Sequence, residues 1–158
     1  MTKWMFAISL LIFVGCKDLG EEAPSLPPTI PVKDLLAVPE SIVVDAETLT
    51  VSTYMWRNFM PTVPSSNTGL IALVYIGKVD STKMSNSITA DAVWIVSGEQ
   101  AWRSFLAEAN QPPSNRLCRI ARNGPEWDGP ADVIVRVFGS RGDEHMLRAS
   151  RQAIGKVY

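Results

Sequence analysis

The side chains best suited to catalysis or metal binding are scarce in this sequence. The only histidine is His145, and the two cysteines are Cys16 and Cys118. A histidine-rich zinc site or a hydrolytic triad needs several such groups close together, so this inventory argues against both. A lone cysteine on a strand is usually a small core residue. We therefore expect no metal, no cofactor and no catalytic pair of Cys118 with His145.

Carboxylates gather in two loop segments, one with Glu126, Asp128 and Asp132 and the other with Asp143 and Glu144. Calcium takes six or more oxygen ligands from converging loops, and glycosidases use two carboxylates that flank the bond they cut. Carboxylates in loops are more often simply solvated. The sequence therefore predicts a protein that is not an enzyme, with a carboxylate-based glycosidase as a weaker alternative.

Trp127 stands in a polar loop rich in Gly and Pro, from Asn123 to Pro130. An exposed indole in such a loop can stack on a sugar or a peptide, whereas a buried one closes the end of the fold. Both interpretations stay open. We take Trp127 as the candidate ligand-binding residue of a carbohydrate-binding module, with Trp56 as a second aromatic.

Arg141-Gly142-Asp143 spells the adhesion tripeptide that integrins recognise. Gly139 and Ser140 precede it, and this composition is typical of a hairpin turn. Because a three-residue motif often occurs by chance, we interpret the segment as a turn.

The overall charge excludes one class of partner. Lys and Arg number 15 and Asp and Glu number 16, which gives a net charge of -1. Without a positive field the chain is not expected to bind nucleic acid. Basic residues concentrate after Glu99, and we interpret them as solvated strand faces in preference to an anion-binding patch.

The first sixteen residues follow the order of a secretory signal. Lys3 lies close to the N-terminus, and an apolar run extends from Trp4 to Val14. That run is too short for a bilayer span, which takes about 20 apolar residues, but it suits a signal peptide. The segment Phe13-Val14-Gly15-Cys16 resembles the lipobox of bacterial lipoproteins.

The resemblance implies removal of residues 1–15 and acylation of Cys16, for example with palmitate. Two or three acyl chains hold a protein on a membrane almost permanently. The expected location is the bacterial outer membrane, facing either the periplasm or the cell surface. An envelope protein or a glycan is the expected partner.

Residues 16–40 are acidic and rich in proline. Prolines lack a backbone donor and favour extended geometry, so this segment is predicted to be a disordered tether. The folded domain is then expected in residues 41–158.

Beyond Glu40, short apolar segments alternate with Gly, Pro, Asn and Ser. This spacing, without long helical patterns, predicts an all-β fold, an antiparallel β-sandwich of about seven strands. In one of them, apolar residues at every second position from Ile88 to Val96 predict a single apolar face. The expected strands are residues 48–56, 70–79, 88–96, 117–122, 132–138, 145–149 and 153–157.

Residues 97–110 fit two structures. Ser97 and Gln100 can form a capping box, and Trp102 and Phe105 fit a helical stripe. Ser97-Gly98-Glu99-Gln100 also reads as a hairpin turn, which we favour because the neighbouring segments are strands.

With Trp94 on an apolar central strand, the domain resembles the immunoglobulin-like sandwiches of bacterial lipoproteins, although the cysteine pair of antibody domains is absent. Together, these features predict a lipid-anchored protein whose sandwich is a non-catalytic binding or accessory domain.

Overall fold

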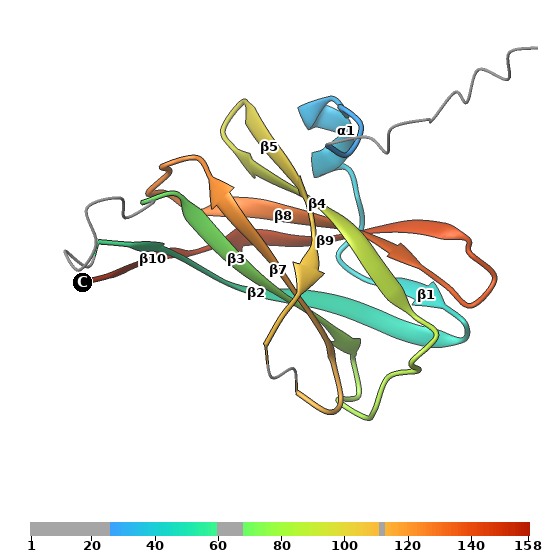
Figure 1. The fold of residues 1–158 in the computed structure, drawn as a ribbon. Coiled ribbons are helices and arrows are strands. Elements are labelled where there is room, and N and C mark those ends of the chain that lie inside the picture. Colours follow the sequence, from blue (N-terminus) through green and yellow to red (C-terminus); the bar gives the residue numbers. More distant parts are fainter. Residues whose placement is uncertain (1–25, 60–67, 111–112) are drawn as a thin grey trace, which may run out of the picture.

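Two β-sheets lie face to face in the computed structural model, which describes residues 26–59, 68–110 and 113–158 (Figure 1). The predicted all-β sandwich is confirmed. The predicted signal peptide and Cys16 lie outside the described residues. Within the described part of the chain, no helix has the length and apolar character needed to cross a membrane.

The larger sheet, here called sheet A, has six strands in the order β1-β2-β3-β7-β6, with β10 also paired to β2. The smaller one, sheet B, has four strands in the order β5-β4-β8-β9. The strands of sheet A are β1 (Ile42–Val44), β2 (Glu47–Asn58), β3 (Leu70–Lys78), β6 (Ala107–Glu108), β7 (Leu117–Gly124) and β10 (Ile154–Val157), and those of sheet B are β4 (Thr89–Ser97), β5 (Gln100–Phe105), β8 (Ala131–Phe138) and β9 (Glu144–Gln152).

The connections follow the immunoglobulin pattern. The hairpin of β2 and β3 crosses to β4 in the other sheet, and β7 returns to pair with β3 before β8 crosses again to pair with β4. The orders β2-β3-β7-β6 and β4-β8-β9 match A-B-E-D and C-F-G of that fold. Ten strands are assigned in the described residues instead of about seven. The predicted antiparallel pairing fails at one place, because β10 pairs with β2 in parallel.

The core lies between the sheets and is built from every second residue of the long strands. On β2 and β3 the inward side chains include Leu49, Val51, Val74 and Ile76, all buried. Burial of such side chains is worth about 1.5–3 kcal/mol each before the entropy cost of ordering them. The residues between them face away from the core.

Strand β4 departs from simple alternation. Its register with β8 shifts between Ala90 and Ala92, as a β-bulge does. Ala90, Val93 and Ile95 therefore join the core between the sheets, whereas Trp94 faces the outer side of sheet B. The prediction of one apolar face from Ile88 to Val96 is wrong for this reason.

The outer side of sheet B is covered by residues 26–40, here called the strap. Its short helix α1 (Val32–Leu36) lies outside sheet B (Figure 1). The fully buried Leu35 of this helix clusters with Trp94 and Ile134. The Trp94 indole donates a hydrogen bond to the Pro28 carbonyl oxygen at 3.0 Å. The tether predicted for residues 16–40 thus differs from the structure in its second half, because apolar residues between the prolines cover an apolar sheet face.

Residues 97–105 form the favoured hairpin. Ser97 pairs with Gln100, and Gly98 has a φ of 60°, which a Gly at the first central position of a two-residue turn readily adopts. Trp102 packs partly buried against the main core, and Phe105 packs against the cluster that Leu35 forms with Trp94.

Candidate functional site

Three aromatic residues lie together on the outer face of sheet A. Tyr54 and Trp56 occupy successive outward positions of β2, and Tyr75 lies on β3 opposite Ser52. We call Tyr54, Trp56 and Tyr75 the aromatic strip. Strands of a sheet with one solvated face normally place apolar residues on the inner face and polar residues on the outer face. Three aromatic residues on the outer face are therefore unusual.

The strip presents rings to solvent. Tyr54 is 58% exposed, and Trp56 and Tyr75 are half-buried. The Tyr54 and Trp56 ring centroids are 5.2 Å apart with a 37° angle between their planes. Gly155 of β10 is the register partner of Trp56, so no side chain crowds the indole from that strand.

The aromatic strip borders a polar depression of about 250 Å³ on the same face. Tyr75 belongs to both, and Ser52 and Thr50 continue the outward row of β2 beyond it. Lys78 and Arg116 bring two cations to this depression. The Arg116 stem lies over Gly77, where an added Cβ would approach the Arg116 Cγ to 3.1 Å.

On the same face of sheet A, Cys118 of β7 is the register partner of Tyr75 and belongs to a small buried cluster with Ala109 and Ile120. Burial raises the pKa of the Cys118 thiol, and burial together with neighbouring Cys118 raises the pKa of Tyr75. Both groups are therefore protonated at neutral pH. Cys118 acts here as a small apolar residue, and Tyr75 offers a neutral hydroxyl.

Trp127, the candidate ligand-binding residue, lies at one end of the sandwich. It packs partly buried against the main core, and its indole donates a hydrogen bond to Gln100 Oε1 at 3.2 Å. Trp127 and Trp56 therefore have different roles. Trp127 closes one end of the fold, whereas Trp56 lies on the outer face of sheet A.

The Trp127 loop is fixed by a buried arginine. Arg57, 5% exposed, contacts Asp128 Oδ1 at 2.7 Å and Glu126 Oε2 at 3.0 Å, and its Nε donates to the Thr68 carbonyl oxygen. The hydrogen bond from Arg57 lowers the pKa of Asp128. Two of the loop carboxylates considered for calcium or catalysis thus bind an internal cation.

The remaining candidates lie at the β8–β9 turn. The His145 Nε2 is 2.5 Å from Asp143 Oδ2, and this hydrogen bond lowers the pKa of Asp143. Gly142 has a φ of 79° and donates to the Gly139 carbonyl oxygen, as expected of the predicted turn. Cys118 belongs to sheet A and His145 to sheet B, so the structure does not bring this pair together.

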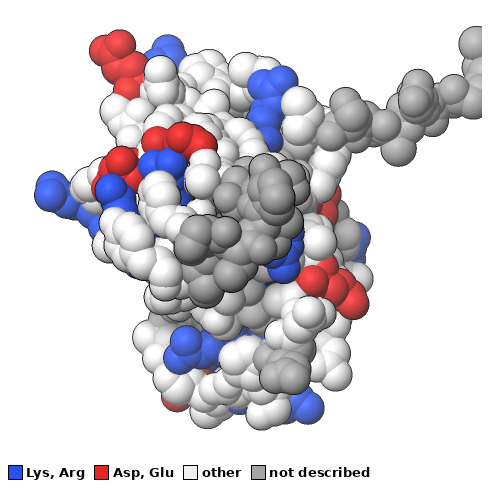
Figure 2. Space-filling view, turned by 60° about the vertical axis from the view of Figure 1, so that its left-hand side comes forward, with Lys and Arg blue, Asp and Glu red and all other residues white. Residues whose placement is uncertain are grey.

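Among the described residues, no three side chains of His, Cys, Asp or Glu gather in a way that could hold a metal ion. The face in Figure 2 carries acidic and basic groups scattered over a mostly uncharged surface. No family model, curated protein or solved structure matches the chain.

Sequence reasoning singled out Trp56 but missed Tyr54 and Tyr75. The signal was present in β2, where Leu49, Val51 and Met55 mark the inward face and thereby assign Tyr54 to the outward one. Pairing between β2 and β3, which the sequence does not reveal, then brings Tyr75 to the same face.

Proposed function

We propose that this protein is a lipid-anchored binding module of the bacterial envelope that binds a glycan on the outer face of sheet A. The anchor rests on the signal-like order of residues 1–15 and the lipobox-like segment ending in Cys16. The binding site rests on the aromatic strip.

The observation that carries the glycan proposal is the adjacency of exposed rings and a polar depression. Tyr54 and Trp56 offer apolar ring faces on which a sugar ring can stack, and Tyr75 adds a hydroxyl. Thr50 and Ser52 supply further donors and acceptors for sugar hydroxyls.

A lysine beside the strip favours a glycan over a protein partner. Cores of protein interfaces are depleted in lysine. Here Lys78 lines the depression that the strip borders. A sugar chain lying along β2 and β3 would contact rings at one end and polar groups at the other.

Binding without catalysis is supported by where the reactive groups lie. Cys118 is buried, His145 is bonded to Asp143, and Glu126 and Asp128 are bound to Arg57. None of these groups lines the polar depression.

The position of the strap is consistent with display of this face. The strap runs over the outer side of sheet B, and the aromatic strip lies on the opposite side of the sandwich. The strap therefore leaves the aromatic strip uncovered.

Binding can be tested with the full-length protein on an array of bacterial envelope and host glycans, followed by titration of any positive glycan while Trp fluorescence is recorded. We expect Trp56→Ala and Tyr54→Ala each to weaken binding by about tenfold or more. Val43→Ala, an exposed apolar residue of β1, is the control and should leave binding unchanged. Equal binding by Trp56→Ala and the parent would remove the proposed site.

Anchoring is tested separately by mass spectrometry of protein extracted from its native envelope. We expect an N-terminus at Cys16 bearing acyl chains, and release into the soluble fraction after Cys16→Ala. An uncleaved, unmodified N-terminus would refute the lipid anchor and leave the glycan proposal to its own test.

A further inference from the structure

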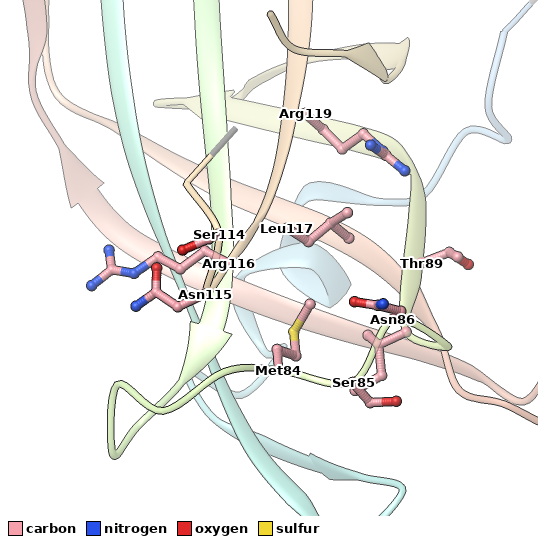
Figure 3. Close-up of a pocket in the computed structure, with 10 residues that line it drawn as sticks. Met84, Ser85, Asn86, Thr89, Ser114, Asn115, Arg116, Leu117 and Arg119 are labelled. Atoms are coloured by element: carbon pink, nitrogen blue, oxygen red, sulfur yellow. The ribbon is translucent and has the colours of Figure 1, made fainter. Parts of the chain in front are cut away.

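A second pocket lies at one end of the sandwich, where the β3–β4 connection meets the start of β7. It has a volume of about 170 Å³ and is separate from the aromatic strip. We call it the end pocket. Figure 3 shows Arg119 on one side of this space and Asn86 on the other, with Leu117 between them, while Arg116 and Asn115 extend away.

Arg119 occupies an unusual position for a charged residue. It pairs with the inward-facing Val74 of β3 and lies between Leu117 and Ala121, which pack in or against the main core. Its side chain is 20% exposed. A charged group on the inward face of a sandwich strand is stabilised there by an ion-pair partner, a polar ligand or water.

The protein partners of Arg119 are weak. Its Nη1 is 3.9 Å from Glu108 Oε1, and the Glu108 side chain is 90% exposed. The same Nη1 donates to the Cys118 carbonyl oxygen at 3.4 Å, near the limit for a hydrogen bond. Among the described residues, no acceptor is found for Nε or Nη2, the two donors that remain for a planar, bidentate partner.

The rest of the pocket lining is mostly polar, with an apolar part formed by three side chains. Asn86 and Asn115 supply amides, Ser85, Thr89 and Ser114 supply hydroxyls, and Met84, Ile88 and Leu117 supply apolar contacts. The lining contains no carboxylate, and the nearby Glu47 is engaged by the Ser85 backbone N–H at 3.2 Å. The pocket is thus electropositive on one side and apolar at its base.

We propose that the end pocket binds a small organic carboxylate. The carboxylate accepts hydrogen bonds from Arg119, and a short apolar chain lies over Leu117, Ile88 and Met84. One water takes up about 30 Å³ in the liquid, so about 170 Å³ suits a ligand of roughly six heavy atoms. Asn86 then contacts the ligand or its carboxylate from the opposite side. Arg116 lines both the end pocket and the polar depression beside the aromatic strip, whereas Arg119, Asn86 and Leu117 line the end pocket and not that depression.

The test is a titration of full-length protein at pH 7 with valerate, its uncharged amide and inorganic phosphate, followed by calorimetry and by the backbone amide signals of Asn86 and Leu117. We expect saturable binding of valerate and at least tenfold weaker binding of the other two, because the amide lacks the charge and phosphate lacks the apolar chain.

The decisive variant is Arg119→Gln, which we expect to weaken valerate binding by about tenfold or more. The affinity of Arg119→Lys for valerate should lie between those of the parent and Arg119→Gln. Arg122→Gln, which changes an exposed arginine on the same strand, is the matched control and should bind as the parent does. Asn86→Ala alters an exposed side chain and keeps the test valid if Arg119→Gln does not fold. Absence of saturable valerate binding, equal binding of phosphate, or unchanged binding in both Arg119→Gln and Asn86→Ala would overturn the proposal.

Discussion

The Trp94 indole N–H lies 3.0 Å from the carbonyl oxygen of Pro28, which joins the centre of sheet B to a segment 66 residues earlier in the chain. Arg103 adds a hydrogen bond to Thr29, and the Arg148 backbone N–H donates to the Pro39 carbonyl oxygen. The strap is therefore held at both ends and, through Leu35, in the middle. Its removal would expose Trp94 and its apolar neighbours to water.

Leu35→Ala should destabilise the whole sandwich. Leu35 is fully buried in the cluster with Trp94, and a Leu→Ala change at such a site typically costs 2–5 kcal/mol. Urea denaturation monitored by Trp fluorescence measures the loss. Val43→Ala, on an exposed side chain, should change stability by less than about 0.5 kcal/mol. Equal stability of the two variants would mean that the strap does not contribute to the fold.

Arg57→Met should loosen the loop that carries Trp127. The substitution keeps much of the buried stem but removes the ion pairs with Glu126 and Asp128, whose exposed side chains can be solvated instead. We expect a loss of about 2–3 kcal/mol. Faster amide hydrogen exchange is expected between Glu126 and Asp128. Arg122→Met serves as the exposed control. Unchanged exchange in the loop would contradict the role assigned to Arg57.

Stability should fall in acid, in part through Asp128. The hydrogen bond from Arg57 lowers the folded-state pKa of Asp128. As the pH drops past the ordinary carboxyl pKa of about 4, the unfolded chain takes up the proton first, and the stabilising contribution disappears as the pH passes the folded pKa. Asp128→Asn should therefore show a smaller stability difference between pH 7 and pH 3 than the parent. An identical difference in urea denaturation would exclude this contribution. Asp34→Asn, an exposed position on α1, is the control.

Cys118 should react slowly in the folded protein. Its burial raises the thiol pKa and blocks access, so the thiolate is scarce and shielded. In a Cys16→Ser variant, where Cys118 is the only thiol, alkylation by iodoacetamide at pH 7.5 should be at least about tenfold slower without urea than with it. Equal rates would show that Cys118 is accessible in the folded protein.

Strand segments were predictable because alternation of apolar and polar residues is local. The predicted segment at 117–122 corresponds to β7, for example, and the segment at 132–138 to β8. The inward and outward faces of β4 were not predictable, because the bulge before Ala92 depends on pairing with β8. The strap was also not predicted. Leu35 is an apolar residue in a proline-rich segment, and the surface that it covers is known only once Trp94 is found to face outward.

The candidate sites also combine residues that the sequence indicates with residues that only the structure reveals. Trp56 could be selected from its residue type, but Tyr75 joins it only through the pairing of β2 and β3. Arg119 carries no local signal at all. Its neighbours Leu117 and Ala121 mark the inward face, but only the position of β7 over β4 and β5 shows that this face ends in a pocket.

The strap also determines how a pulling force enters the molecule. Tension applied to the chain ahead of Leu26 reaches the Pro28 contact with Trp94 before it reaches any strand. The strap would then peel from sheet B one contact at a time, while the hydrogen-bonded ladders of both sheets carry no tension until it has detached. A force applied ahead of Leu26 would therefore detach the strap before it unfolds either sheet.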